Sequence, residues 1–272
     1  MKKLLKETIV CMVKTSKRFI SILVIVLLGV GFFAGIRAVA PDMKNTLDDY
    51  YEKTNMYDIY IASNYGIRED IIDKLQKKYG DKSLHSIYFG GKKEHPKICF
   101  VFMNPTAGNI ATTKDWDGPR YPWLGTKNIW KLFNQVDLID KEIFDEIQAK
   151  KRKDWTKEFC EKVYKNIEEH DIFITNLAKC TQIDARPLKD DFYKAYLKLF
   201  MKEMSIVKPE KIVLFGNQVS SIVLGEKIKV SEVRKKKFEK DGFEFYSVFY
   251  PVGNGIFNID KSIEDILYIK SK

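Results

Sequence analysis

Hydrophobic and polar positions along the chain follow two different patterns, and the change falls at about residue 83. Residues 19–36 are almost wholly apolar, and Ser21 is their only polar side chain. The second part instead contains short apolar or β-branched runs, each with the length and composition of a buried strand. Four such runs predict strands, over residues 97–103, 171–177, 211–216 and 243–250.

Helical spacing of apolar residues fills most of the intervals between these strands. It predicts helices over residues 126–136, 157–169, 190–207 and 217–225, the last with Asn217 as its N-cap and Gly225 at its end. The pair Asp241-Gly242 predicts the turn of a hairpin leading into the last strand. Strands that alternate with helices predict an α/β fold with three α/β/α layers around a central, mostly parallel four-stranded sheet.

The apolar run near the N-terminus predicts a transmembrane helix over about residues 19–40, because about 20 apolar residues span a bilayer. Its alternatives are a cleaved signal peptide, for which the run is long, and a buried core helix. The basic residues before it predict a cytoplasmic N-terminus. They are Lys2, Lys3, Lys6, Lys14, Lys17 and Arg18.

Residues 8–66 resemble the N-terminal segment of ABC-transporter permeases of the FtsX/MacB-like kind. The resemblance is carried by "KTSKRFISILVIVLLGVGFFAGIRA" and by "PDMKNTLDDYYEKTNMYDIYIASNYGI". Such permeases begin with a basic flank, one transmembrane helix and an extracytoplasmic domain. Because no other apolar run of 18 residues follows residue 40, a transport function is not complete in this chain. We therefore divide the chain into residues 1–66, a linker at 67–82, and a second domain at 83–272.

Charge and cysteine content narrow the classes of partner and cofactor. The formal net charge is +10, which favours anionic partners such as nucleic acid or lipid headgroups. The chain has three histidines and four widely spaced cysteines without a CxxC pair, which argues against a zinc site, a disulfide framework or a histidine-based triad. The cysteines are Cys11, Cys99, Cys160 and Cys180.

Amides, glycines and prolines follow the four predicted strands, with almost no acidic residues among them. Ligands of open α/β sheets bind at the carboxyl ends of the strands, so these residues form the candidate site. Turn formation alone accounts well for the glycines and prolines, but less well for Asn104 and Asn176. The pattern predicts a neutral, hydrogen-bonding ligand beside a phosphate backbone. The segments are Asn104-Pro105-Thr106, Thr175-Asn176 with Lys179-Cys180, Gly216-Asn217-Gln218, and residues 250–258.

Residues 83–272 resemble the uracil-DNA glycosylase superfamily, through five segments in the family's order. "FVFMNPTAGN" is similar to the first motif, in the variant of the mismatch-specific thymine/uracil branch where Asn-Pro replaces an acidic residue. "DIFITNLAKC" and "KIVLFGNQVSSIVLG" resemble the second and third strand motifs, and "RYPWLGTKNIWKLF" the segment with the base-stacking aromatic residue. "YPVGNGIFN" stands in the place of the last motif, usually a histidine-proline turn before a DNA-wedging loop.

The resemblance implies hydrolysis of the N-glycosidic bond of uracil, or of a related damaged or mismatched base, flipped out of DNA. It implies that Asn176 reads the base edge and Trp123 stacks on the base. Asn104 would only position the water by hydrogen bonds, because an amide is too poor a base to take its proton. Tyr250, at the usual histidine position, would donate a hydrogen bond to the leaving base together with the backbone amides of Thr106 and Ala107.

DNA contacts are implied at two further places. Gly253-Asn254-Gly255 would form a turn that presents Ile256 and Phe257 as the wedge. Lys127, Lys179 and Arg186 are expected to contact phosphates. No iron–sulfur cluster is expected, because only Cys180 matches a ligand position and Tyr196 stands at another.

The expected partners are DNA containing uracil or a related base and, through residues 19–40, a membrane; we expect a monomer. The protein is membrane-anchored by this prediction, or cytoplasmic if the N-terminal segment is artefactual or cleaved. Two alternatives to an enzyme stay open: a nucleic-acid-binding module with weak or no catalysis, which the Tyr250 departure favours, and a fragment of a transporter permease. The excised base and the side of the membrane that the domain faces stay open too.

Overall fold

The computed structural model describes residues 2–14, 16–53, 69–186 and 188–272. Contacts along the chain divide it into two compact units, Met1–Tyr60 and Ile61–Lys272. Residues 54–66 of the permease-like segment and residues 67–68 of the predicted linker lie outside the described residues.

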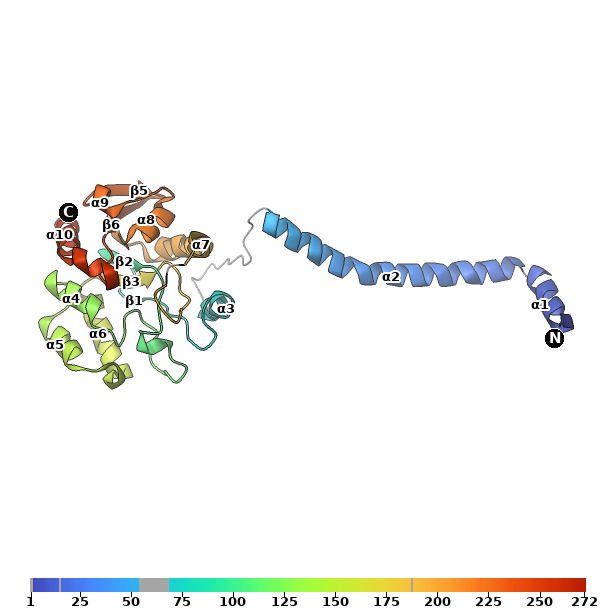
Figure 1. The fold of residues 1–272 in the computed structure, drawn as a ribbon, viewed down its shortest axis with the longest axis horizontal. Helices are drawn as coiled ribbons and strands as arrows, with labels where there is room; N and C mark the ends of the chain where they lie inside the picture. The colour runs from blue at the N-terminus through green and yellow to red at the C-terminus, as the bar shows by residue number, and fades with distance from the viewer. Residues whose placement is uncertain (1, 15, 54–68, 187) are drawn as a thin grey trace. The chain divides into compact units, whose positions relative to one another are not determined.

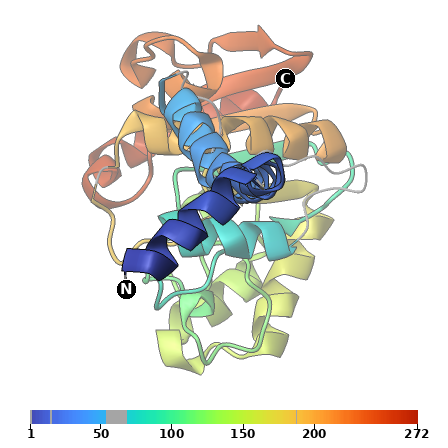
Figure 2. The same ribbon diagram turned by 90° about the vertical axis from the view of Figure 1, so that its right-hand side faces the viewer.

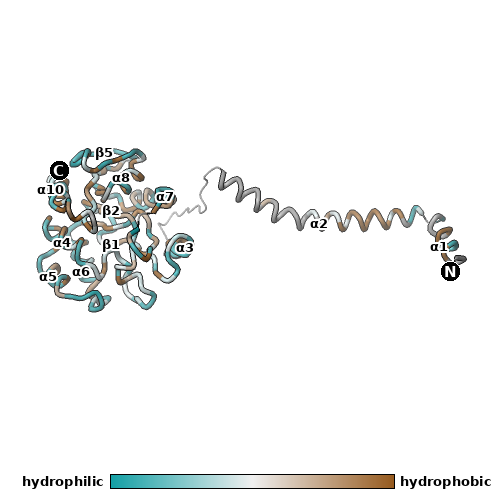
Figure 3. Tube along the Cα trace, viewed as in Figure 1, coloured by the Kyte–Doolittle hydropathy of each residue, from teal (hydrophilic) through white to brown (hydrophobic). Residues whose placement is uncertain are grey.

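The N-terminal unit consists of helices α1 (Lys2–Lys14) and α2 (Ser16–Lys53). The apolar part of α2 is visible as a brown stretch in Figure 3. Its window Ser16–Phe33 has a mean hydropathy of 2.0 and is not buried by protein, so in the described part of the chain this is one helix long and apolar enough to cross a membrane. A signal sequence near an N-terminus also meets this criterion of length and hydropathy. The helix predicted at about residues 19–40 falls within α2.

A six-stranded mixed sheet forms the centre of the second unit, in the order β1-β3-β2-β4-β6-β5. The inner strands β3, β2, β4 and β6 are parallel, and the edge strands β1 and β5 are antiparallel to their neighbours (Figure 1). The strands are β1 Gly90–Gly91, β2 Ile98–Phe102, β3 Ile172–Asn176, β4 Lys211–Phe215, β5 Lys237–Lys240 and β6 Phe243–Val248.

The prediction of a four-stranded sheet is therefore corrected to six strands, although its four strands are the parallel centre. The two edge strands lack the apolar signature of buried strands: β1 is only two glycines, and β5 is a polar, half-exposed segment. The predicted hairpin between β5 and β6 is confirmed. Asp241 and Gly242 have φ values of 51° and 80°, the two positive angles of a type I′ turn.

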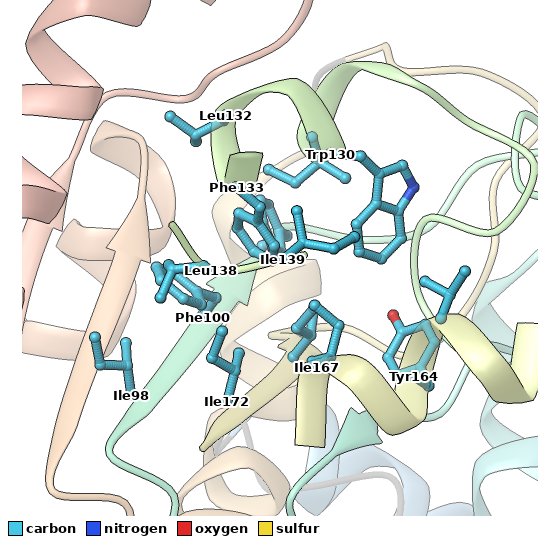
Figure 4. Close-up of a cluster of buried hydrophobic side chains, with 14 of the residues drawn as sticks. Ile98, Phe100, Trp130, Leu132, Phe133, Leu138, Ile139, Tyr164, Ile167 and Ile172 are labelled. Atoms are coloured by element: carbon cyan, nitrogen blue, oxygen red, sulfur yellow. The ribbon is translucent and has the colours of Figure 1, made fainter. Parts of the chain in front are cut away.

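One face of the sheet carries the larger core cluster, which helices α4, α5, α6 and α10 cover. Phe100 of β2 packs on Phe133 of α4 with ring centroids 5.0 Å apart, as Figure 4 shows among the buried side chains of this layer. Figure 2 shows the β5–β6 hairpin at one end of the unit and α5 and α6 at the other. The helices are α4 Asn128–Gln135, α5 Lys141–Ala149, α6 Lys157–Glu169 and α10 Ile259–Lys270.

The opposite face is covered by α3 (Glu69–Tyr79), α7 (Asp190–Val207) and α8 (Asn217–Leu224). The predicted linker is corrected over residues 69–79, which form this helix and pack against the sheet. Ile72 and Leu75 of α3 are buried, and the Gln76 carboxamide accepts from the Thr181 amide at 2.7 Å and donates to its carbonyl at 3.3 Å. These bonds fix α3 to the segment that follows β3.

Short helices complete the unit, and one of the predicted caps differs. Gly216, with φ 91°, is the N-cap of α8, whereas the Asn217 carboxamide accepts from the Val230 amide at 2.9 Å. Gly225 ends α8 in the left-handed conformation, as predicted. The short helices are α9 Val230–Val233 and the 3₁₀ turns η1 Ile110–Thr112, η2 Arg152–Asp154 and η3 Gly253–Asn258.

Candidate active site

The carboxyl ends of the parallel strands bring together side chains that are far apart in the sequence. Phe102, the last residue of β2, pairs in register with Asn176, the last residue of β3. Because side chains alternate along a strand, both point to the sheet face of Phe100 and Ile174, under α4 and α6. Phe215 ends β4 on the same face, and Tyr250, two residues past β6, packs against that core.

Phe102 is the centre of an aromatic cluster at this edge. Its ring stacks on Phe215 with centroids 4.5 Å apart and an interplanar angle of 13°. Trp123 and Tyr250 meet it edge-on, at 4.9 Å and 6.3 Å. Phe102 and Phe215 are fully buried, whereas Trp123 and Tyr250 are partly exposed and form the outer side of the cluster. The two outer rings are therefore the ones that a flat ligand can reach.

Trp123 is held in a backbone conformation that is unusual for a large side chain. Its φ is 61°, in the left-handed region, and its carbonyl accepts from the Thr126 hydroxyl at 2.7 Å and from the Trp130 indole at 3.3 Å. Its own indole N–H is buried without a hydrogen-bond partner. Strained backbone of this kind costs of the order of 1–3 kcal/mol and clusters at binding sites. Trp123 is thus a fixed aromatic face with one unsatisfied donor.

Asn176 is the most informative polar residue of the cluster. Its side chain is 3% exposed, yet no group among the described residues forms a hydrogen bond with its carboxamide. Its polar atoms are not among the fully buried side-chain atoms without a partner, so the carboxamide keeps contact with solvent instead of facing the core. The position therefore offers one acceptor and one donor to a ligand.

Asn104, which follows β2, is held by its neighbours instead. The Tyr193 hydroxyl of α7 donates to Asn104 Oδ1 at 2.6 Å, and Asn104 Nδ2 donates to the Pro105 carbonyl at 3.0 Å. Burial raises the pKa of Tyr193, which keeps this hydroxyl protonated as a donor. One lone pair on Oδ1 and one N–H remain for a water molecule.

The loop after Asn104 runs beside the segment that follows β3. Thr106 forms an isolated parallel bridge with Gln182, and the Ala107 amide donates to the Gln182 carbonyl at 2.9 Å. The expected use of the Ala107 amide for a leaving anion is therefore wrong, because that donor is occupied. Within the described ranges the Thr106 amide has no hydrogen-bond partner, so it stays a candidate donor.

Tyr250 presents a neutral hydroxyl to the cluster. Burial raises its pKa to about 12, and no described group forms a hydrogen bond with its hydroxyl. A glycine allows the close packing around it, because a Cβ on Gly255 would lie 1.8 Å from the Tyr250 carbonyl oxygen. Only glycine fits at position 255, so the segment after Tyr250 folds tightly back on it.

The expected wedge segment forms the 3₁₀ turn η3. It leaves Ile256 51% exposed and Phe257 88% exposed, although both are large and apolar. Gly253 supplies a positive φ of 59° at its start, and the side chain of Asn254 lies outside the described ones. Exposed apolar side chains on a short turn are suited to insertion between stacked bases.

The structure gives the three expected phosphate contacts different surroundings. Lys179 is 1% exposed, bonds to Thr175, and pairs with Glu203 at 2.8 Å. A phosphate cannot reach it, so that prediction is wrong. The Lys127 ammonium donates to the Gln148 carbonyl, and the exposed Arg186 pairs with Asp184 at 2.8 Å. Both remain at the surface.

Sequence reasoning missed two residues that hold the site's loops. Tyr193 fixes Asn104, and the Arg152 guanidinium donates to the carbonyls of Ala107 at 2.9 Å and Asn109 at 3.3 Å. Neither carries a motif signal, because each acts on a loop that is more than forty residues away in the sequence. The basic run around Arg152 is the one hint that the sequence offered.

The residues that the structure describes do not fit an iron–sulfur cluster. Cys99, Cys160 and Cys180 are free and buried, and no group of three or more potential metal-ligating side chains occurs in the described ranges. Burial raises the pKa of the Cys160 and Cys180 thiols to about 12.

Comparison with known families agrees with this geometry. A family model described as the uracil DNA glycosylase superfamily matches residues 89–257, which is more than half of the chain and spans every segment of the site. It supports a DNA glycosylase-like function for the second unit. Residues 8–66 have no such support as a permease fragment, and the transport alternative is not carried further. The chain therefore belongs to the uracil DNA glycosylase superfamily.

Proposed function

We propose that the second unit hydrolyses the N-glycosidic bond of uracil, or of a closely related base, in DNA. The observation that carries this proposal is the Asn176 carboxamide, which has no protein partner at a strand end. Asn176 pairs in register with Phe102, the ring that the partly exposed Trp123 and Tyr250 contact. A flat base with an adjacent donor and acceptor supplies what this site lacks. Uracil has such an edge in its N3–H and O4.

Base binding would use Asn176 and the aromatic cluster together. The Asn176 Oδ1 accepts from the base N3–H and its Nδ2 donates to O4, which satisfies both halves of the carboxamide. Trp123 provides the stacking face, which is worth roughly 1–3 kcal/mol per base. Ile256 and Phe257 enter the duplex and offset the cost of extruding the nucleotide, which is a few kcal/mol.

Cleavage would depend on stabilising the departing base. The bond from the sugar C1′ to the base nitrogen breaks, its electron pair stays on the base, and a water oxygen adds to C1′ with its proton passing to solvent. The Tyr250 hydroxyl and the Thr106 amide are the donors placed for the anion. Asn104, held by Tyr193, orients the water but is too weak a base to take its proton.

The test is incubation of the full chain in detergent with single- and double-stranded oligonucleotides that contain one uracil. The expected product is an abasic site, detected as alkali-sensitive strand cleavage, and Asn176→Ala should remove most of it. Asn166→Ala is the matched control. Asn166 is equally buried, but its carboxamide is already bonded to the Asp140 amide and carboxylate, at 3.0 Å and 2.8 Å. Wild-type protein that binds DNA without forming abasic product would sink the enzyme proposal.

That outcome would favour the second candidate, a nucleic-acid-binding module without catalysis. One observation supports it. The named polar residues of the site contain no carboxylate or histidine, and burial raises the pKa of Tyr250 to about 12. Such a site binds a base and offers no proton acceptor near neutral pH. The same oligonucleotides decide between the two, since binding is measured in the presence of uracil and product is measured separately.

For the N-terminal unit we propose membrane attachment through α2. The proposal is supported by the uncovered apolar window at Ser16–Phe33. Fractionation of native cells followed by N-terminal sequencing tests it. Full-length chain in the membrane fraction is the expected result, whereas a soluble chain that begins after residue 33 identifies a cleaved signal.

A further inference from the structure

Four consecutive basic residues, Lys150 to Lys153, connect α5 to α6. Lys151, Arg152 and Lys153 are exposed, and none of them forms an ion pair with any residue that the structure describes. The carboxylate of the next residue, Asp154, accepts from the Lys151 amide at 3.1 Å. This basic turn therefore keeps a net charge of +3, from four basic residues against one carboxylate.

The basic turn is held in one conformation from both sides. On one side, the Lys150 amide continues the end of α5 by donating to the Glu146 carbonyl at 3.2 Å, and the Lys150 ammonium lies 4.7 Å from the centre of the Phe159 ring. On the other side, Trp155 is 3% exposed and packs edge-on against the same ring, with centroids 5.0 Å apart. The backbone of the turn is therefore ordered before a ligand binds, which lowers the entropy lost on binding.

Arg152 fixes the basic turn to the rim of the candidate site. It bonds to the carbonyls of Ala107 and Asn109 in the loop after β2, and a Cβ on Gly125 would lie 3.0 Å from Arg152 Cγ. The turn therefore lies between the loop that carries Asn104 and the loop that carries Trp123. Because Arg152 is committed to backbone carbonyls, Lys151 and Lys153 are the residues with free ammonium groups.

We propose that the basic turn binds the phosphate backbone of the DNA strand that carries the extruded nucleotide, with Lys151 and Lys153 contacting its phosphates. The inference rests on the proposed function for its ligand class. A strand whose base enters at Asn176 must bring its own phosphates to the rim, and a turn of net positive charge with an ordered backbone lies there. Such contacts add affinity without regard to sequence, and the affinity falls with salt. Lys151 and Lys153 thus replace the buried Lys179 as the proposed phosphate contacts.

Fluorescence anisotropy of the full chain in detergent tests the proposal, with labelled duplexes with and without uracil. The variant is Lys151→Gln with Lys153→Gln. The matched control is Lys202→Gln with Lys227→Gln, the same charge change at two exposed lysines. These lie in the second half of α7 and beyond the end of α8, helices that run away from the carboxyl edge of the sheet.

The expected result is about tenfold weaker binding of both duplexes by the variant at 100 mM salt, and a salt dependence whose slope falls by about 2. The control should keep the wild-type slope. Equal losses in variant and control, or no loss in either, would overturn the proposal. Because binding is measured on both duplexes, a protein that forms no abasic product but shows the specific loss contradicts the excision proposal alone.

Discussion

Two neighbouring residues of β3 point to opposite faces of the sheet and differ in their hydrogen bonding. Thr175 faces α7, where its hydroxyl joins a closed network with Lys179 and Glu203, and all three side chains are buried and hydrogen-bonded. Asn176 faces the other layer, is equally buried, and has no partner among the described residues. The polar groups on the α7 face hydrogen-bond to one another, whereas the Asn176 carboxamide on the other face is available to a ligand.

The difference explains why burial alone does not identify function. Buried charges such as Lys179 and Glu203 are costly, and the protein tolerates them because each satisfies the other. The Asn176 carboxamide still reaches solvent, so its lack of a protein partner costs little and leaves it available to a ligand. The satisfied network is thus a stability element, whereas the unsatisfied amide indicates a binding site.

The largest effect should come from breaking the closed network. Lys179→Met leaves the Glu203 carboxylate buried and unpaired, which should destabilise the second unit by about 3–5 kcal/mol. Urea unfolding, followed by the fluorescence of the tryptophans, measures it. The double variant Lys179→Met with Glu203→Leu should recover much of the loss. A loss below about 1 kcal/mol in the single variant would contradict this view of the network.

Asn176→Ala should lower excision activity without lowering the stability of the second unit. Removing an unsatisfied amide should leave the free energy of unfolding unchanged or slightly higher. If the proposed function holds, excision should fall about a hundredfold, which is about 2.7 kcal/mol of transition-state stabilisation. For Asn166→Ala, the loss of satisfied hydrogen bonds predicts a destabilisation of about 1–3 kcal/mol. An equal destabilisation by Asn176→Ala would contradict the distinction between the two faces of the sheet.

Tyr193→Phe should have a smaller effect on the same edge of the sheet. It removes the hydroxyl that donates to Asn104 Oδ1 at 2.6 Å and keeps the ring. We expect kcat to fall about tenfold with KM unchanged, because a freely rotating amide holds water less precisely while the base still binds. A matching rise in KM would show instead that Tyr193 shapes the base pocket.

The smallest expected effect is that of pH. Asn104, Asn176 and Trp123 have no titrating group, and the pKa of Tyr250 is raised to about 12. The excision rate should therefore be nearly flat from pH 6 to 9. It should fall only as the pH approaches the pKa of Tyr250, about 12, where this residue loses its donor proton and becomes an anion beside the departing base. A rise between pH 6 and 8 would reveal a general base that the site as described does not contain.

The sequence alone predicts the strands that position the site, but not the residues that hold its loops. Asn104 and Asn176 stand directly after or at the end of apolar runs, so their place at the carboxyl edge followed from alternation of strands and helices. Tyr193 and Arg152 act across long stretches of chain, and spacing carries no signal for such contacts. Lys179 was misassigned because a lysine usually lies at the surface, and its partner Glu203 is on a different helix. The edge strands were missed since two glycines and a charged segment lack apolar periodicity.

The inert thiols of the second unit have a practical consequence for measuring motion. Cys99, Cys160 and Cys180 are buried with raised pKa values, so reagents that attack thiolates should pass them by. With Cys11 replaced, a cysteine introduced at the exposed Asp260, beside η3, becomes the single labelling position. A dye there would report in real time when the Phe257 turn meets a duplex, and the native sulfur atoms would not contribute a background signal.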